Sequence, residues 1–186
     1  DYRVARGVLY GLSSTGVLYT IQTETGQMTR VGNAPPVALS GQRFGFDFNP
    51  AADRIRVVSD TGQNLRLHPD TGALAASDPP VRLPDAAVRL GGAGYTYNKK
   101  DDKLTTNFAV DLARGDLLVQ GSREGVTPVV SPNTGSLTRV GGMGTGPLED
   151  AAFDIADLNN AAYVAARTAG RTQLHVIDLE SGRATR

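Results

Sequence analysis

The sequence predicts an all-β fold, a β-propeller, from a repeated turn, a repeated order of strands and a period-two alternation of apolar residues. The turn has the form T/S-G and recurs at Thr25-Gly26, Thr71-Gly72, Thr134-Gly135 and Ser181-Gly182. The spacings are 46, 63 and 47 residues, which makes the third unit the long one. A period in the forties is typical of propeller blades.

Each unit opens on a strand rich in aromatic or apolar residues. These strands read D-Y-R at 1–3, F-G-F-D-F-N-P at 44–50, G-Y-T-Y-N at 94–98 and A-F-D-I at 152–155. The segments that follow keep the same order and alternate with period two, so each unit offers about four short strands. A β-sandwich is the rival architecture, but it would not need a repeated strand order.

Four blades are therefore expected, approximately at 1–32, 44–83, 92–141 and 151–186. The final G-R-A-T-R stops inside a pattern that reads G-Q-M-T-R-V-G at 26–32 and G-S-L-T-R-V-G at 135–141. We accordingly expect a single domain truncated at both ends, with five blades in the intact protein and six as the alternative.

Composition excludes several classes of function. Nineteen Lys and Arg balance nineteen Asp and Glu, whereas nucleic-acid binders normally carry a basic excess. The absence of Cys excludes disulfides, thiol catalysis and Cys-ligated metals, and no apolar run is long enough to span a membrane.

Residues 91–94, G-G-A-G, precede a strand instead of following one, so we interpret them as a flexible entry to blade three and not as a phosphate loop.

Asp47 and Asp154 occupy equivalent places in their repeats, and Asp1 is a possible third equivalent. They are calcium candidates, because oxygen ligands suit a hard cation on the propeller axis. The favoured interpretation is structural, with each carboxylate accepting hydrogen bonds that lock its blade.

Arg54, Arg56 and Arg66 are candidates for binding an anionic ligand. Residues 54–59 and 64–68 should form a hairpin. If residues 57 and 66 pair, Arg66 lies on the opposite face from Arg54 and Arg56. The favoured interpretation is salt bridges between blades, with Asp47, Asp53, Asp60 and Asp70 as the nearby acids.

His68 and His175 are the only histidines, and the repeat separates them by two blades. We therefore expect no catalytic role for either, no tightly bound transition metal and no cofactor. Buried positions are predicted for a set of alternating or inter-blade residues: Tyr19, Phe46, Phe48, Leu65, Leu67, Phe153, Val176 and Ile177.

The run G-F-D-F-N-P-A-A-D-R-I-R-V-V-S-D-T-G-Q-N-L-R-L-H-P-D-T-G at 45–72 resembles a bacterial family known as domain of unknown function 4394. The A-A-F-D-I and L-H-V-I-D-L-E-S-G segments are similar to the same family. This resemblance implies a secreted, periplasmic or cell-surface β-propeller-like domain, hence an extracytoplasmic location, and it implies no activity.

The leading hypothesis is a non-enzymatic propeller that works as a scaffold or protein-interaction module, or as an accessory subunit of a larger assembly. No convergent catalytic motif is present, and the rigid loops of a propeller suit protein partners. The alternative is a propeller hydrolase or lyase with an axial calcium-type site.

Overall fold

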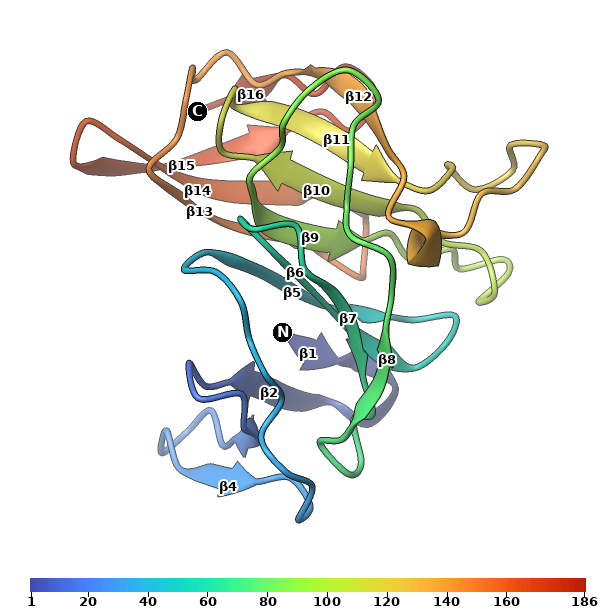
Figure 1. Cartoon of the computed structure of the whole chain (residues 1–186), viewed down its shortest axis with the longest axis vertical. Coiled ribbons are helices and arrows are strands. Elements are labelled where there is room, and N and C mark those ends of the chain that lie inside the picture. The colour runs from blue at the N-terminus through green and yellow to red at the C-terminus, as the bar shows by residue number, and fades with distance from the viewer.

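The computed structural model describes residues 1–186 and confirms an all-β propeller arrangement of four blades (Figure 1). Each blade is one four-stranded antiparallel sheet, and its strands follow one another in chain order. Helix is confined to two short 3₁₀ turns, η1 (Val4–Arg6) and η2 (Pro132–Thr134), and no helix is long and apolar enough to cross a membrane.

The sixteen strands fall into four groups of four. Blade one contains β1 (Tyr2–Arg3), β2 (Val8–Leu12), β3 (Leu18–Ile21) and β4 (Met28–Arg30). Blade two contains β5 (Phe44–Asn49), β6 (Arg54–Ser59), β7 (Asn64–Leu67) and β8 (Leu74–Ser77). Blade three contains β9 (Leu90–Tyr95), β10 (Asn107–Asp111), β11 (Asp116–Gln120) and β12 (Leu137–Gly142). Blade four contains β13 (Asp150–Ile155), β14 (Ala162–Thr168), β15 (Arg171–Ile177) and β16 (Ala184–Thr185).

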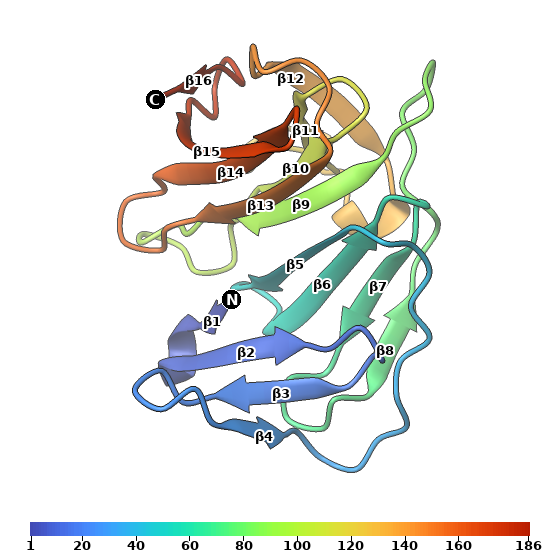
Figure 2. The same ribbon diagram turned by 90° about the vertical axis from the view of Figure 1, so that its left-hand side faces the viewer.

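The first strand of each blade lies toward the middle of the arrangement, and the fourth lies outside (Figure 2). β9 contacts both β5 and β13, so the inner strands of blades two, three and four pack side by side. The sheet of blade three runs from Leu90 to Gly142 and so extends past the expected 92–141 at both ends. Its extra length lies in the β9–β10 and β11–β12 connections, which explains the 63-residue spacing.

The glycine run at 91–94 is not a flexible entry but part of β9 itself, and every residue of β9 is buried. Glycines are found here because the neighbouring inner strands, β5 and β13, pack closely against β9. A Cβ at Gly92 would lie 2.7 Å from Cβ of Phe153 in β13. A Cβ at Gly45 in β5 would lie 2.5 Å from the backbone nitrogen of Ala93. Glycine is therefore required for close packing of strands, not for phosphate binding.

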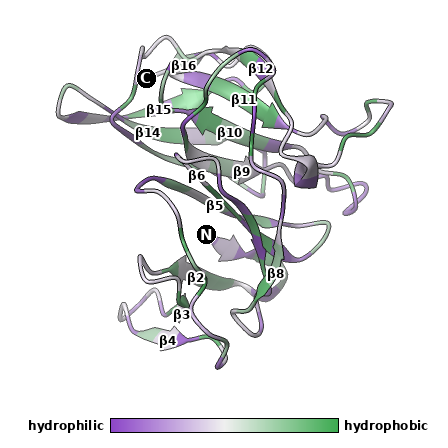
Figure 3. Ribbon diagram, in the orientation of Figure 1, coloured by the Kyte–Doolittle hydropathy of each residue, from purple (hydrophilic) through white to green (hydrophobic).

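Apolar side chains form three separate cores, each between two consecutive blades. The largest has 14 buried residues, including Phe108 and Phe153, and joins blades three and four. A cluster of 8 that includes Tyr10 and Phe48 joins blades one and two, and a cluster of 7 around Leu118 joins blades two and three. Figure 3 shows the apolar colour along β10 and β11 of blade three, which packs on both sides.

Blades one and four each have one neighbour, which corrects part of the predicted core. Five of the predicted residues are buried: Phe48, Leu65, Leu67, Phe153 and Ile177. Tyr19 and Phe46 are only half-buried, and Val176 is 43% exposed. Tyr19 and Val176 lie on the outward faces of blades one and four, where no further sheet covers them.

Candidate functional site

Three aspartates converge where the inner strands meet. Carboxylate oxygens of Asp1, Asp47 and Asp154 all lie within 4.8 Å of one another. They come from blades one, two and four, as their equivalent places in the repeat predict. Blade three has Thr96 at this place in its Y-T-Y-N segment, and the Thr96 hydroxyl accepts a hydrogen bond from the Thr106 backbone N–H at 2.8 Å.

Two of the carboxylates join neighbouring blades. Asp1 Oδ2 accepts a hydrogen bond from the backbone N–H of Phe48 at 2.9 Å, and Asp47 Oδ2 accepts one from the backbone N–H of Tyr95. Asp154 Oδ1 accepts from the N–H of Ile155, its own neighbour in the chain. These contacts support the structural interpretation for Asp1 and Asp47, whereas Asp154 is exposed and makes no contact with another blade through this bond. Calcium binding by Asp47 and Asp154 stays a prediction.

Asp47 is an ionisable group held in an unfavourable environment. Burial raises the pKa of its carboxyl well above the usual range, and the negative charge of Asp154 adds to this, while the hydrogen bond from Tyr95 opposes it. The folded chain therefore binds this proton more tightly than the unfolded chain does. The resulting stability is fully present below the unfolded pKa of 3.8 and is lost as the pH rises through the raised folded pKa.

Replacing Asp47 with Asn should stabilise the protein at neutral pH, because the amide cannot ionise and its oxygen can still accept from Tyr95. The advantage over the parent should shrink as the pH falls toward 3.8, the ordinary value for this group. Urea unfolding at a series of pH values measures this difference. The exposed Asp102→Asn serves as the control and should change little, and a D47N variant less stable than the parent at neutral pH would contradict the prediction.

The three arginine candidates lie on one face, which corrects the predicted register. Arg56 pairs directly with Arg66, and Val57 pairs with Leu65. Because side chains alternate along a strand, Arg54, Arg56 and Arg66 all point from blade two toward blade three. Together with Tyr95, they line a pocket of about 220 Å³ between these blades.

The ionic partner of Arg56 and Arg66 is Asp78, which lies just beyond β8 in the same blade. Arg66 donates to both Asp78 oxygens, from Nε at 2.8 Å and from Nη2 at 2.9 Å. Arg56 donates from Nη1 to Asp78 Oδ2 at 2.8 Å. The predicted salt bridges between blades are therefore wrong for this set, and the contacts of Arg56 with blade three are hydrogen bonds to Tyr95 and Asn133.

The four acids expected as partners have other contacts. Asp53 and Asp70 both bind Arg3, a buried arginine of blade one that the sequence analysis did not single out. Asp60 accepts from the backbone N–H groups of Gln42 and Arg43, and Asp47 accepts from Tyr95. Salt bridges between blades do exist, but they use other arginines. Arg3 joins blade one to blade two, and Arg123 of blade three pairs with Glu180 of blade four.

The two histidines lie in different blades. His68 follows β7 of blade two, and its Nδ1 accepts from the backbone N–H of Asp70 at 3.2 Å. His175 lies in β15 of blade four. The structure does not bring them together, and the expected absence of a metal role stays a prediction.

Two residues that contact the arginines of this pocket, Asp78 and Tyr95, were not predicted from the sequence. Asp78 lies 22 residues from Arg56 along the chain, and only the observed pairing of β6, β7 and β8 brings them into contact. Tyr95 belongs to the next blade. Tyr95 could have been found from the G-Y-T-Y-N segment, because an aromatic residue in the inner strand of blade three faces a neighbouring blade.

Four meander sheets around a common centre, tied by inner-strand carboxylates, define the protein as a β-propeller of unknown function. The chain belongs to the family described as Domain of unknown function (DUF4394), whose model matches residues 1–186. Among solved structures, it is similar to a glutaminyl cyclase from Myxococcus xanthus, with 16% sequence identity and a TM-score of 0.52. The match covers 92% of this chain and 70% of that one, and it shows a shared fold alone. No curated protein matches the sequence.

Proposed function

We propose that the protein is a non-enzymatic, extracytoplasmic β-propeller that works as a scaffold and binds another polypeptide on the uncovered faces of blades one and four. The observation that carries this proposal is the apolar character of these faces. The location rests on the family resemblance of residues 45–72, and fractionation of cells that produce the full-length gene product tests it.

The outward face of blade four presents large apolar side chains on adjacent strands. Tyr163 of β14 pairs with Val176 of β15, and Leu174 lies two residues before Val176 on the same face. All three are exposed, and Leu174 is 65% exposed. Contiguous exposed apolar side chains are characteristic of surfaces that bind other proteins.

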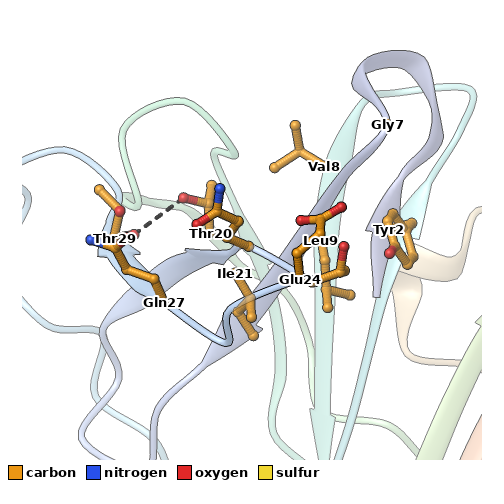
Figure 4. A pocket seen from close by; sticks show the side chains of 11 residues that line it. Tyr2, Gly7, Val8, Leu9, Thr20, Ile21, Glu24, Gln27 and Thr29 are labelled. Atoms are coloured by element: carbon orange, nitrogen blue, oxygen red, sulfur yellow. Dashed lines mark hydrogen bonds between the residues drawn. The ribbon is translucent and has the colours of Figure 1, made fainter.

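The outward face of blade one is similar in character. The cross-strand row Tyr2, Leu9, Ile21 and Met28 runs over its four strands. Tyr2, Leu9 and Ile21 line a pocket of about 480 Å³ together with polar residues that include Gln27 and Glu24 (Figure 4). Surfaces that bind proteins likewise combine apolar and polar groups.

Photo-cross-linking in the producing cell tests the proposal. A photoreactive residue at position 174 or 28 should form an adduct with a second polypeptide, because Leu174 and Met28 lie on the two uncovered faces. The control is position 158, because Leu158 is 72% exposed but lies in a turn of blade four.

Adducts at 174 and 28 but not at 158 would support the proposal. An adduct only with further residues of the same polypeptide would show that another blade covers these faces, and it would contradict partner binding. Equal labelling at 158, or none at 174 and 28, would also contradict it.

Two enzymatic alternatives are tested separately. The hydrolase or lyase alternative predicts that added calcium raises the melting temperature through Asp47 and Asp154, and that D47N abolishes the effect. The structural neighbour is named a glutaminyl cyclase. We expect no glutaminyl cyclase activity from this chain, because only the fold is shared.

A further inference from the structure

We propose that the pocket between blades two and three binds a small phosphate monoester. This site is distinct from the faces of blades one and four, so the proposal does not depend on the proposed scaffold role. Its walls come from Arg54, Arg56 and Arg66 of blade two and from Tyr95 and Asn133 of blade three.

The pocket carries an excess of positive charge. Three guanidinium groups line it, and Asp78 is the one carboxylate that contacts any of them. Arg54 donates from Nη1 to the backbone oxygen of Asp53, at 2.8 Å, and the Asp53 carboxylate is held by Arg3. The local charge is therefore about +2, which a phosphate monoester of charge about −2 would neutralise at pH 7.

The positive charge is held rigidly and partly out of water. Arg56 is 1% exposed and is fixed by Asn64 at 2.7 Å, by Asp78 and by Asn133. Its Nε donates to the Tyr95 hydroxyl oxygen at 3.2 Å, which leaves the hydroxyl proton for another acceptor. The donors that remain for a ligand are Nε and Nη2 of Arg54 and Nη1 of Arg66, because the other nitrogens of these two groups already donate within the protein. Each charge-assisted bond from such a donor to a phosphate oxygen is stronger than a neutral one.

Unpaired polar atoms in the same interface are a second, independent indication of a ligand. Asn107 and Gln120 lie beside Tyr95 in one cross-strand row, and both are fully buried. Both side-chain polar atoms of Asn107 and Oε1 of Gln120 have no hydrogen-bond partner. Buried polar atoms without partners are rare, because each costs the full penalty of desolvation.

Gln120 connects these atoms to the pocket. Its Nε2 donates to the backbone oxygen of Pro132 at 2.8 Å and to Oδ1 of Asn64 at 3.1 Å. Pro132 lines the pocket, and Asn64 binds Arg56. A bound oxyanion and its hydration water would bring both acceptors and donors to this interface.

The size of the pocket limits the ligand. About 220 Å³ lies below the range of pockets that hold drug-sized molecules. A phosphate on a small organic group fits this volume, whereas a nucleotide or a polymer would project out of it.

Calorimetric titration of the purified protein with glycerol 3-phosphate tests the proposal, with acetate as a monoanionic probe. Arg54→Gln is the diagnostic variant, because Arg54 makes no ion pair and its loss leaves the Arg56–Arg66–Asp78 network intact. Affinity should fall about tenfold or more when one guanidinium contact to phosphate is removed. The matched control is Arg82→Gln, whose exposed guanidinium also donates to a backbone oxygen, that of Thr134.

Saturable binding of glycerol 3-phosphate that is weakened in R54Q and unchanged in R82Q would support the site. Inorganic phosphate binding in the same pattern would also support it and would show that the oxyanion suffices. Binding of acetate as tight as that of glycerol 3-phosphate would overturn the assignment to a dianion. No binding, or equal binding by R54Q and the parent, would overturn the site itself, provided that both chains show the same unfolding transition.

Discussion

Replacing Phe48 with Ala should lower the free energy of unfolding by about 3–5 kcal/mol, which is the cost typical of removing a buried aromatic ring. Phe48 is 2% exposed and belongs to the core between blades one and two. Its ring packs edge-on against Tyr10, with 5.2 Å between the centroids, and lies 6.5 Å from the ring of Phe46. The loss should therefore loosen blade one from the rest of the chain.

Urea unfolding followed by circular dichroism measures this effect. Tyr163→Ala is the matched control, because Tyr163 is an aromatic residue that lies on the uncovered face of blade four. It should change stability far less. If Phe48→Ala unfolded at the same urea concentration as Tyr163→Ala, the assignment of Phe48 to the core would fail.

Replacing Arg56 with Met should cost about 3–5 kcal/mol, the range found when one partner of a buried ion pair is removed. The Asp78 carboxylate would keep Arg66 but lose Arg56, and its side chain is only 7% exposed. Tyr95 and Asn64 would lose their charged donor at the same time. Most of the cost comes from the polar atoms left behind, because they cannot regain water.

The control is Arg167→Met, which removes one partner of the Arg167–Glu149 pair. Both side chains of that pair are about half exposed, at 50% and 49%, and such pairs contribute at most about 1 kcal/mol. Urea unfolding of the two variants should therefore differ by several-fold in the change of stability. Equal effects would show that Arg56 is not held as a buried ion pair.

The repeat was sufficient to predict the blades and their inner strands, because both depend on local alternation and on turn residues. It also predicted the meeting of Asp47 and Asp154, since equivalent places in a ring of blades converge on the axis. The register in which β6 pairs with β7 could not be predicted from the repeat. A shift of one residue moves Arg66 from one face of the sheet to the other, and the flanking residues fit either register.

The sequence also did not predict which residues of blades one and four are buried. Val176 and Ile177 are adjacent apolar residues of one strand, and they point to opposite faces. Ile177 packs against the core shared with blade three, whereas Val176 lies on the uncovered face. Only the number of blades and their order in space distinguish the two positions, and neither is a local property of the chain.

The strictly sequential order of strands within each blade has a consequence for how the protein is made. Every ladder joins consecutive strands, and apart from the β9–β10 and β11–β12 connections of blade three the linking segments are short. Loop closure is therefore inexpensive, and each sheet can form soon after its residues leave the ribosome. The apolar side chains of blades one, two and three, however, are fully covered only after the next blade has been synthesised. Until the next blade is made, one apolar face of the newest blade is exposed to solvent. Slow translation between blades should therefore increase aggregation, and a chaperone that binds the exposed face should reduce it.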